Sequence, residues 1–326
     1  MGPLQSALLA LCLAVAACGR DAPESRAGEG VPVRLALNWF PEAEHGGYYA
    51  ALVHGLYDRA GIRMEILGGG PDAPVVQRVA TGEVLFGVTG ADNLLNARAA
   101  GADIVAVMAP YQINPRCIMV HASTGLARIE DLADLTLALS QGPAFSHYLR
   151  WRYPFPGVAV VPYHGSIAPF LLDERYAQQG YVFSEPVMAR RQGADVRVLM
   201  VAETGFNPYA SLLIARRETL SRQPDLVRAV TAAAVAGWQQ YLDAPEETNQ
   251  HIHQLNPEMD LEILAIGARE SRPLVFDAVA AERGLGSMTA ARWDTLQHQM
   301  EQAGVLEVGS APAAQAFDDA FVPGRE

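Results

Sequence analysis

The stretch NWFPEAEHGGYYAALVHGLYDRAGI, residues 38–62, follows directly on the apolar run VRLAL at residues 33–37. Such a run predicts a buried strand, and the Gly-Gly step at residues 46–47 opens a segment with helical spacing. In open α/β sheets, ligands bind where the carboxyl end of a strand meets the start of a helix. Backbone N–H groups there donate to ligand oxygens, and aromatic rings offer flat faces. The stretch therefore predicts both an α/β fold and a small-molecule site.

Five residues of this stretch are candidate ligand-binding residues: Asn38, Trp39, His45, Tyr48 and Tyr49. A second interpretation is that the aromatic residues belong to the core and that the Gly-Gly step is only a tight turn. The residues by themselves leave both interpretations open.

Apolar runs alternate with helical patterns from residue 33 to about residue 215, which predicts an α/β fold with parallel or mixed sheets. The expected strands are at residues 33–38, 62–67, 84–89, 103–109, 116–121, 135–139, 158–162, 180–183, 195–201 and 210–215. Helices are expected at residues 46–59, 72–81, 91–100, 145–152, 166–173 and 185–193, and beyond residue 217 at 225–241, 246–254, 260–268, 275–284 and 289–303.

Two junctions between expected strands, at residues 109–116 and 201–210, lack a helix and contain Pro and Asn. Paired crossings of this kind are typical of two lobes, one inserted in the other. We expect lobe I to hold residues 32–114 and 210–326, and lobe II to hold residues 115–209.

The N-terminal segment, residues 1–17, carries no charged side chain and includes an apolar run from Ala7 to Ala17. This run is shorter than the ~20 residues of a membrane-spanning helix, so it predicts a cleaved export signal. Val15-Ala16-Ala17-Cys18 resembles a lipobox, and we expect Cys18 to be acylated and to anchor the chain to a membrane. The polar residues 18–31 are expected to form a tether. The alternative is the N-terminal helix of a cytosolic protein.

The charge balance excludes several classes of function. The chain has 24 basic and 36 acidic residues, and every basic residue is an arginine. Without lysine the chain cannot form a Schiff base, hold pyridoxal phosphate covalently or build a P-loop. An acidic chain also lacks the positive surface that nucleic acids require. We expect no cofactor. We also expect no metal site at His251 and His253, because two residues that are two apart on a helix point in different directions.

Other ends of expected strands carry polar residues that could face a ligand. Glu185 is a candidate acceptor, although a carboxylate in the first turn of a helix is also stabilised there by the helix dipole. Two interpretations are open for three residues of the second crossing. Their side chains contact the ligand, or they only hold the crossing in place; the residues are Phe206, Asn207 and Tyr209. The remaining candidates at strand ends are Thr89, Asp92, Asn93, Gln141 and Gly142.

The stretch 38–62 resembles the first strand and helix of solute-binding proteins of the nitrate, sulfonate and thiamine-pyrimidine family. VATGEVLFGVTGADNLLNARAAGADIVAVMA (residues 79–109), IEDLADLTLALSQG (129–142) and GYVFSEPVMARRQGADVRVL (180–199) resemble later units of the same family. The resemblance implies a type II periplasmic binding fold and delivery of a solute to the permease and ATPase of an ABC importer. Thr89 and Asn93 look like the positions of the lysine and histidine of the family's pyrimidine synthases, and the synthases' cysteine run is missing, so the resemblance implies a binding protein and no enzyme. We also expect a monomer.

The aromatic and acidic candidates favour a small aromatic heterocycle as ligand, and our first expectation is a thiamine-precursor pyrimidine. Riboflavin would use the same aromatic residues. Nitrate, a sulfonate or taurine would require basic groups, and Arg116 is the one that we can place near the site. The second function class is an exported enzyme, with His45 as base and Glu185 or Glu44 as acid. The third is the input domain of a sensor. The expected location is the membrane surface facing the periplasm or the cell exterior.

Overall fold

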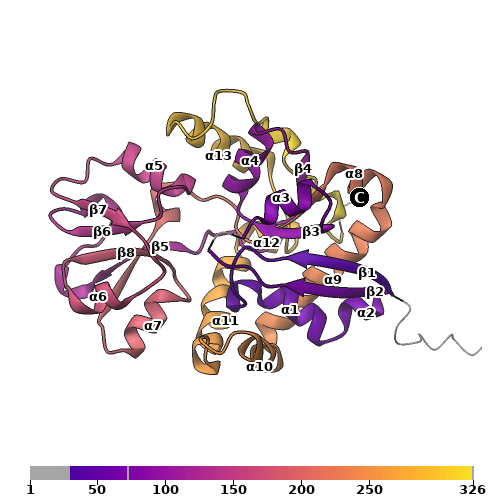
Figure 1. Cartoon of the computed structure of the whole chain (residues 1–326), viewed down its shortest axis with the longest axis horizontal. Helices are drawn as coiled ribbons and strands as arrows, with labels where there is room; N and C mark the ends of the chain where they lie inside the picture. Colours follow the sequence, from indigo (N-terminus) through magenta and orange to yellow (C-terminus); the bar gives the residue numbers. More distant parts are fainter. Residues whose placement is uncertain (1–29, 72, 325–326) are drawn as a thin grey trace, which may run out of the picture.

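The computed structural model describes residues 30–71 and 73–324 and contains two five-stranded sheets (Figure 1). The expected export signal, Cys18 and all but the last two residues of the expected tether lie outside the described residues. Within the described ranges, no helix is both long enough and apolar enough to cross a membrane.

The first sheet has the strand order β2-β1-β3-β10-β4, and β10 runs antiparallel to both of its neighbours. β1 pairs with β2 in parallel, with Val33 opposite Met64 and Leu35 opposite Ile66. Every residue of β4 is buried, which is the pattern of a strand covered on both faces. The strands are β1 (Val31–Ala36), β2 (Ile62–Leu67), β3 (Phe86–Thr89), β4 (Ile104–Met108) and β10 (Leu212–Arg216).

The second sheet has the order β7-β6-β8-β5-β9, and here β5 is antiparallel to both neighbours. The strands are β5 (Arg116–His121), β6 (Thr136–Leu139), β7 (Ala159–Pro162), β8 (Tyr176–Tyr181) and β9 (Val196–Met200). β5 and β10 are the strands by which the chain enters each sheet after crossing from the other. Both sheets are therefore mixed.

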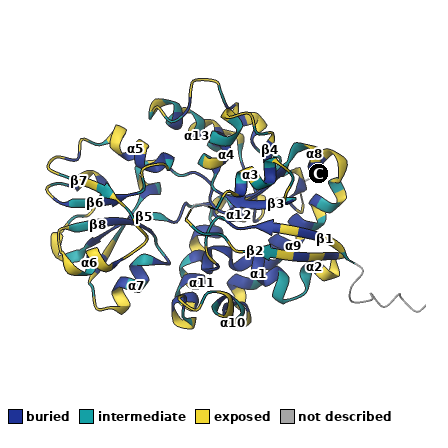
Figure 2. Cartoon of the chain, viewed as in Figure 1, coloured by how far each residue is buried: buried dark blue, intermediate teal, exposed yellow. Residues whose placement is uncertain are grey.

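We call the part built on the first sheet the first half and the part built on the second sheet the second half (Figure 1). Three helices belong to the second half: α5 (Ala144–Arg152), α6 (Ala168–Leu172) and α7 (Glu185–Arg191). The helices of the first half are α1 (Gly46–Val53), α2 (Leu56–Arg59), α3 (Val75–Ala80), α4 (Ala91–Ala99), α8 (Arg217–Arg222), α9 (Pro224–Asp243), α10 (Glu246–Leu255), α11 (Leu261–Val275), α12 (Ala278–Arg283) and α13 (Ala290–Gln302). Figure 2 shows buried residues concentrated in the strands, whereas α6 and α10 carry many exposed residues.

The expectations differ from the structure at several elements: α8 was not expected, α11 extends beyond the expected 260–268, and β8 and the helix expected at 46–59 differ as follows. The strand expected at residues 180–183 is β8, which begins at Tyr176 and includes the buried polar residues Gln178 and Gln179. The Gln179 side chain accepts from Ser140 N at 2.6 Å, so its polar group is satisfied inside the sheet. The helix expected at residues 46–59 breaks at Gly55, which adopts φ 64° between α1 and α2. A left-handed residue ends a helix, and glycine adopts this conformation without strain.

The Gly-Gly step allows α1 to pack closely on α9. A Cβ atom on Gly47 would lie 2.1 Å from the ring of Trp238, and one on Gly237 would lie 2.2 Å from the carbonyl oxygen of Gly47. Trp238 is fully buried. These glycines are therefore required by the contact between two helices.

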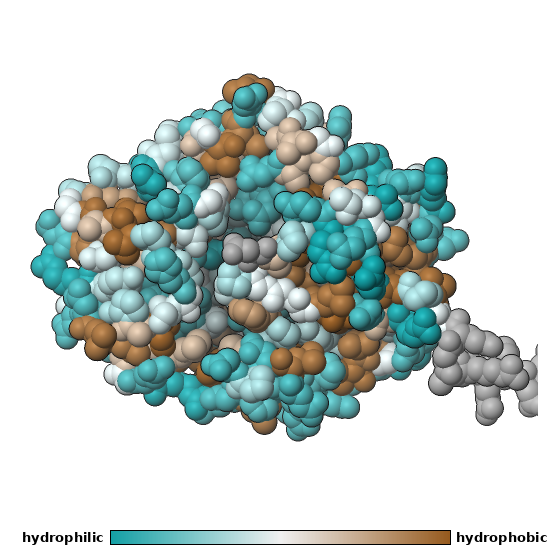
Figure 3. Space-filling view, viewed as in Figure 1, coloured by the Kyte–Doolittle hydropathy of each residue, from teal (hydrophilic) through white to brown (hydrophobic). Residues whose placement is uncertain are grey.

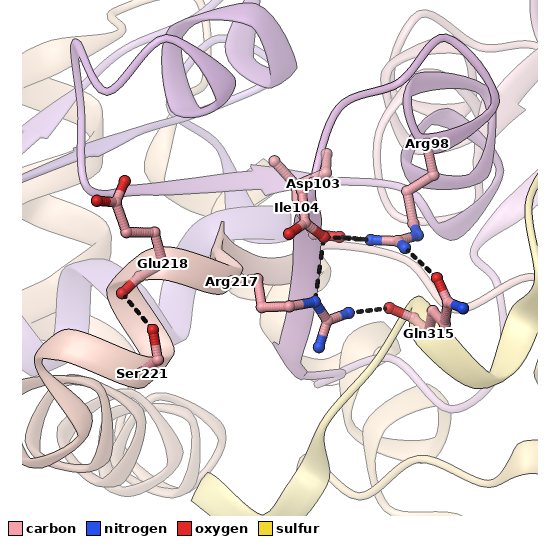
Figure 4. Close-up of polar contacts among 7 residues, drawn as sticks. All are labelled: Arg98, Asp103, Ile104, Arg217, Glu218, Ser221 and Gln315. Carbon is pink, nitrogen blue, oxygen red and sulfur yellow. Dashed lines mark hydrogen bonds and ion pairs between the residues drawn. The ribbon is translucent and has the colours of Figure 1, made fainter.

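The C-terminal segment returns to the first sheet (Figure 4). Arg217 donates to Asp103 Oδ1 at 3.1 Å and to the carbonyl oxygen of Gln315 at 2.7 Å, and Arg98 donates to the side chain of Gln315. Asp318 N donates to the carbonyl oxygen of Ala106 in β4. The first half is thus assembled from both ends of the described chain.

Candidate functional site

The loop after β1 begins the candidate site with a hydrogen-bonded group. Asn38 donates to Glu44 Oε1 at 3.3 Å, and Ser211 Oγ donates to the same oxygen at 2.6 Å. His45 Nε2 lies 3.1 Å from Asn38 Oδ1, and burial lowers the pKa of this fully buried imidazole. Asn38, Glu44 and His45 therefore hold one another in fixed positions.

Trp39 and Phe40 are the aromatic residues of this loop that keep accessible surface. Trp39 is half-buried, and Phe40 is 47% exposed. Their rings meet edge to face, with centroids 5.6 Å apart. This pair offers an aromatic face beside the first strand.

Tyr48 and Tyr49 lie in the core of the first half, with 0% and 1% of their surface exposed. The Tyr48 hydroxyl donates to the carbonyl oxygen of Ser211 at 2.7 Å, and its ring packs against Trp238. Tyr49 packs against His251. Their position matches the core interpretation of the stretch, so we leave both out of the proposed site.

The end of β3 places Thr89, Asp92 and Asn93 at three different depths: Thr89 is buried, Asp92 half-buried and Asn93 exposed. Burial raises the pKa of the Asp92 carboxyl, which the N–H groups of Asn93 and Ala144 and the charge of Arg116 lower in part. Ala144 is the first residue of α5 in the second half. Asp92 therefore lies at the boundary between the halves.

Arg116, at the start of β5, carries the positive charge of this boundary. Its guanidinium lies over the rings of Phe145 and Tyr181, at 4.7 and 4.4 Å from their centroids. Burial opposes its charge, but Tyr181 and the carboxylates of Glu185, Asp92 and Glu44 outweigh burial and raise the pKa.

Glu185 is held by groups of the second half. The Tyr163 hydroxyl donates to Oε1 at 2.6 Å, and Tyr181 N donates to Oε2 at 2.8 Å. Burial first, and then the charge of Glu185, raise the pKa of Tyr163, which remains a hydrogen-bond donor. Glu185 is thus an ordered acceptor at the start of α7.

Gln141 and Gly142 are exposed in the loop that leads to α5. No atom lies within 4 Å of the position that a Cβ on Gly142 would take. These two residues stand at the surface near the first turn of α5, and the structure gives them no fixed partner among the described residues.

Phe206, Asn207 and Tyr209 fix the second crossing. Asn207 Oδ1 accepts from Asn114 N at 2.8 Å, which joins the second crossing to the first. Phe206 stacks on Tyr148, with centroids 4.7 Å apart. Tyr209 accepts from Thr289 N at 3.0 Å.

Glu42 is a residue of the site that the sequence analysis missed. Its side chain is 5% exposed, and Ser184 Oγ of the second half donates to Glu42 Oε2 at 3.4 Å. Burial, together with the charges of Glu44 and Glu185, raises the pKa of Glu42 well above its usual range. Tyr163 was also missed, although it directly follows β7, the same kind of position that identified the other candidates.

The two halves also meet through an ion pair between α7 and α11. Arg191 lies 2.5 Å from Asp260 Oδ1 and 3.2 Å from Glu262 Oε2. Asp260 also caps the start of α11 by accepting from the N–H groups of Glu262 and Ile263. Figure 3 shows the surface hollowed between the two halves. Among the described residues, no group of His, Cys, Asp and Glu side chains could hold a metal ion.

The comparison with protein families decides the classification, because the model described as "NMT1/THI5 like" matches residues 42–248. The chain belongs to this NMT1/THI5-like family. The matched range begins at Glu42 and ends in α10, so it includes Glu42, Glu44, Asp92, Arg116 and Glu185, whereas β1, Asn38 and Trp39 precede it.

Two relatives of this NMT1/THI5-like protein are binding proteins. It is 29% identical to the riboflavin-binding protein RibY of Chloroflexus aurantiacus, over 90% of this chain and 86% of the relative. It is 20% identical to the formylaminopyrimidine-binding protein of Halalkalibacterium halodurans, over 80% of this chain and 82% of the relative.

Among solved structures, the periplasmic aliphatic sulphonate-binding protein SsuA of Escherichia coli has a similar fold. The TM-score is 0.69 at 16% identity, and the match covers 87% of this chain and 91% of SsuA. The expected α/β fold of periplasmic binding proteins is therefore confirmed.

Proposed function

We propose that this chain is the substrate-binding protein of an ABC importer and that it captures a small aromatic heterocycle between two lobes. Lobe I would be residues 32–114 and 210–326, and lobe II residues 115–209. The proposal is carried by the accessible ring of Trp39, whose chain neighbour Asn38 donates to Glu44 of the first half, and by the ordered acceptor Glu185 of the second half, which shares Glu42 with Glu44 as an electrostatic partner. We expect a ligand ring that stacks on Trp39 to contact groups of both halves.

Riboflavin is our first candidate ligand, and a thiamine-precursor aminopyrimidine is the second. The riboflavin-binding relative shares more of its sequence with this chain than the formylaminopyrimidine-binding relative does. Trp39 and Phe40 suit the ring of either compound, and acceptors such as Glu185 suit ring N–H and amino groups. Both ligands are thus compatible with the same surface.

The charge of the site argues against nitrate, sulfonates and taurine. Three carboxyl groups, those of Glu44, Asp92 and Glu185, act on Arg116, and a fourth, that of Glu42, interacts with Glu44 and Glu185. The Arg116 guanidinium is covered by Phe145 and Tyr181. An anion would meet more negative than positive charge and would have to displace these rings, so an uncharged ligand is favoured.

We propose that the protein binds its ligand without changing it. His45, the base of the rival enzyme hypothesis, is 0% exposed, and its Nε2 is hydrogen-bonded to Asn38. The thiol of Cys117 is buried, and burial raises its pKa, so the reactive thiolate is disfavoured.

Export and membrane attachment through acylated Cys18 are part of the same proposal, with the permease and ATPase of the importer as partners and a monomeric binding protein. The test is mass spectrometry of the compound that co-purifies with the protein, followed by titration with riboflavin, the aminopyrimidine thiamine precursor and taurine. We expect a heterocycle, recovered unchanged after incubation. Binding of taurine alone, or a converted compound, would contradict the proposal.

A further inference from the structure

Glu42 has a different setting from Glu44 and Glu185, and shares with Asp92 a hydrogen bond from the other half. Two hydrogen bonds hold Glu44 from within the first half, and two hold Glu185 from within the second. Glu42 comes from the first half, but the hydrogen bond that it accepts comes from Ser184 of the second half. Its carboxyl group therefore lies between the halves and is enclosed only while they are together.

The charged and titratable groups around Glu42 are acids and phenols. Glu44 and Glu185 act on its carboxyl group through their charges. The charge of Glu42 contributes to raising the pKa of four phenol groups, which come from both halves. They are those of Tyr111, Tyr163, Tyr181 and Tyr241. The charge of Arg116 interacts with Tyr181, Glu185, Asp92 and Glu44, and no basic group is among the causes that act on Glu42.

Burial and two neighbouring carboxylates disfavour the ionised form of Glu42, and the hydrogen bond from Ser184 offsets this only in part. The protonated form has no charge to desolvate, and it has one O–H donor beside one carbonyl acceptor. A neutral carboxylic acid can therefore form two parallel hydrogen bonds with a ligand edge that carries an acceptor next to a donor.

We propose that Glu42 is a specificity-determining residue that acts as a neutral carboxylic acid and pairs with the donor–acceptor edge of the heterocycle. The ligand class is a ring with a lactam edge, as in riboflavin, or an amino–imine edge, as in an aminopyrimidine. This inference rests on the proposed function, because it concerns the ligand of the same cleft. It adds that closure over the ligand takes up a proton at Glu42.

The sign of the pH dependence follows from this linkage. When the halves separate, Glu42 meets water and its pKa returns toward the ordinary value, whereas closure raises it. The bound state then holds more protons than the free state, so affinity is greatest below the ordinary pKa of glutamic acid. It falls by up to about tenfold per pH unit as the pH rises toward the raised pKa, and is constant above it.

The test measures the dissociation constant of riboflavin by flavin fluorescence from acidic to mildly alkaline pH. Wild-type protein is compared with Glu42→Gln, which carries a neutral amide of similar shape, and with Glu65→Gln on the exposed face of β2 as the matched control. We expect wild type and Glu65→Gln to lose affinity as the pH rises and Glu42→Gln to bind with constant affinity. Calorimetry in two buffers of different ionisation enthalpy should show proton uptake only where Glu42 is present.

A second ligand tests the pairing itself. Riboflavin methylated at the lactam nitrogen loses the donor of its edge, and we expect wild-type protein to bind it about tenfold more weakly or worse. Equal affinity for the two flavins, or riboflavin binding without proton uptake, would overturn the inference and leave the proposed function intact. Binding of neither riboflavin nor the aminopyrimidine would overturn the proposed function and this inference with it. If Glu42→Gln does not fold, the two-buffer calorimetry of wild-type protein still decides.

Discussion

At the scale of single residues, Trp39 is, together with Phe40, an aromatic group of the loop after β1 that keeps accessible surface. Its indole is half-buried and packs edge to face against Phe40. A ring that is already ordered loses little conformational entropy when a ligand stacks on it. This position therefore suits recognition of a flat ligand.

Replacing Trp39 by alanine should weaken ligand binding by about tenfold or more, because the stacking surface is lost. The dissociation constant of riboflavin, measured by calorimetry, checks this prediction. Trp151→Ala is the control, since Trp151 is 49% exposed on α5. Unchanged affinity of Trp39→Ala would remove this residue from the site.

Glu185→Gln should weaken binding of the aminopyrimidine more than binding of riboflavin. The amide retains one acceptor oxygen but brings an NH₂ group to a place where Tyr163 and Tyr181 N already donate. Neutralising Glu185 also removes a charge that attracts amino groups. Competition titrations with both compounds measure the two losses, and equal losses would show that Glu185 does not discriminate between them.

At the scale of elements, the close packing of α1 on α9 fixes the start of α1 next to the site. Gly47→Ala would drive a Cβ atom into the Trp238 ring, and overpacking of this kind costs about 1–3 kcal/mol. We expect a lower Tm by circular dichroism, with Gly142→Ala as the control because open space surrounds that position. Equal Tm values for the two variants would mean that α1 and α9 separate without cost.

The ion pair between α7 and α11 joins the two halves through partly exposed side chains. Arg191→Ser should lower ligand affinity by a few-fold, since the closed arrangement loses its contacts with Asp260 and Glu262. Added salt should reduce the affinity of wild-type protein toward that of the variant. Arg128→Ser, which removes ion pairs confined to the second half, is the control. A loss of the same size in Arg128→Ser would rule out a specific role for Arg191.

Most elements were predictable because apolar runs and helical spacing are local properties of the chain. The start of β8 was missed because its two glutamines are buried, and the partner of Gln179 is Ser140, the residue that follows β6. The depth of Tyr48 and Tyr49 was not predictable for a similar reason. The face of α1 that becomes core is set by α9, which lies far along the chain.

At the scale of the whole molecule, the two crossings place the ends of both sheets opposite each other. Asn38, Asp92 and Glu185 were predictable as candidates because each follows or closely succeeds a strand. Glu42 was not, because its role depends on the approach of Ser184 from the other half. Local patterns thus identify the elements that border the site, whereas contacts between halves require the assembled structure.

The order in which the chain leaves the ribosome, or emerges from an export channel, acts differently on the two halves. The strands of the second sheet all lie between Arg116 and Met200, in one continuous segment. The first sheet needs β10, α9 and the contact of Asp318 with Ala106, which arrive much later. The second half can therefore complete its sheet while β3 and β4 still lack β10, the strand between them, so the first half is the part exposed to misfolding and to proteases during synthesis.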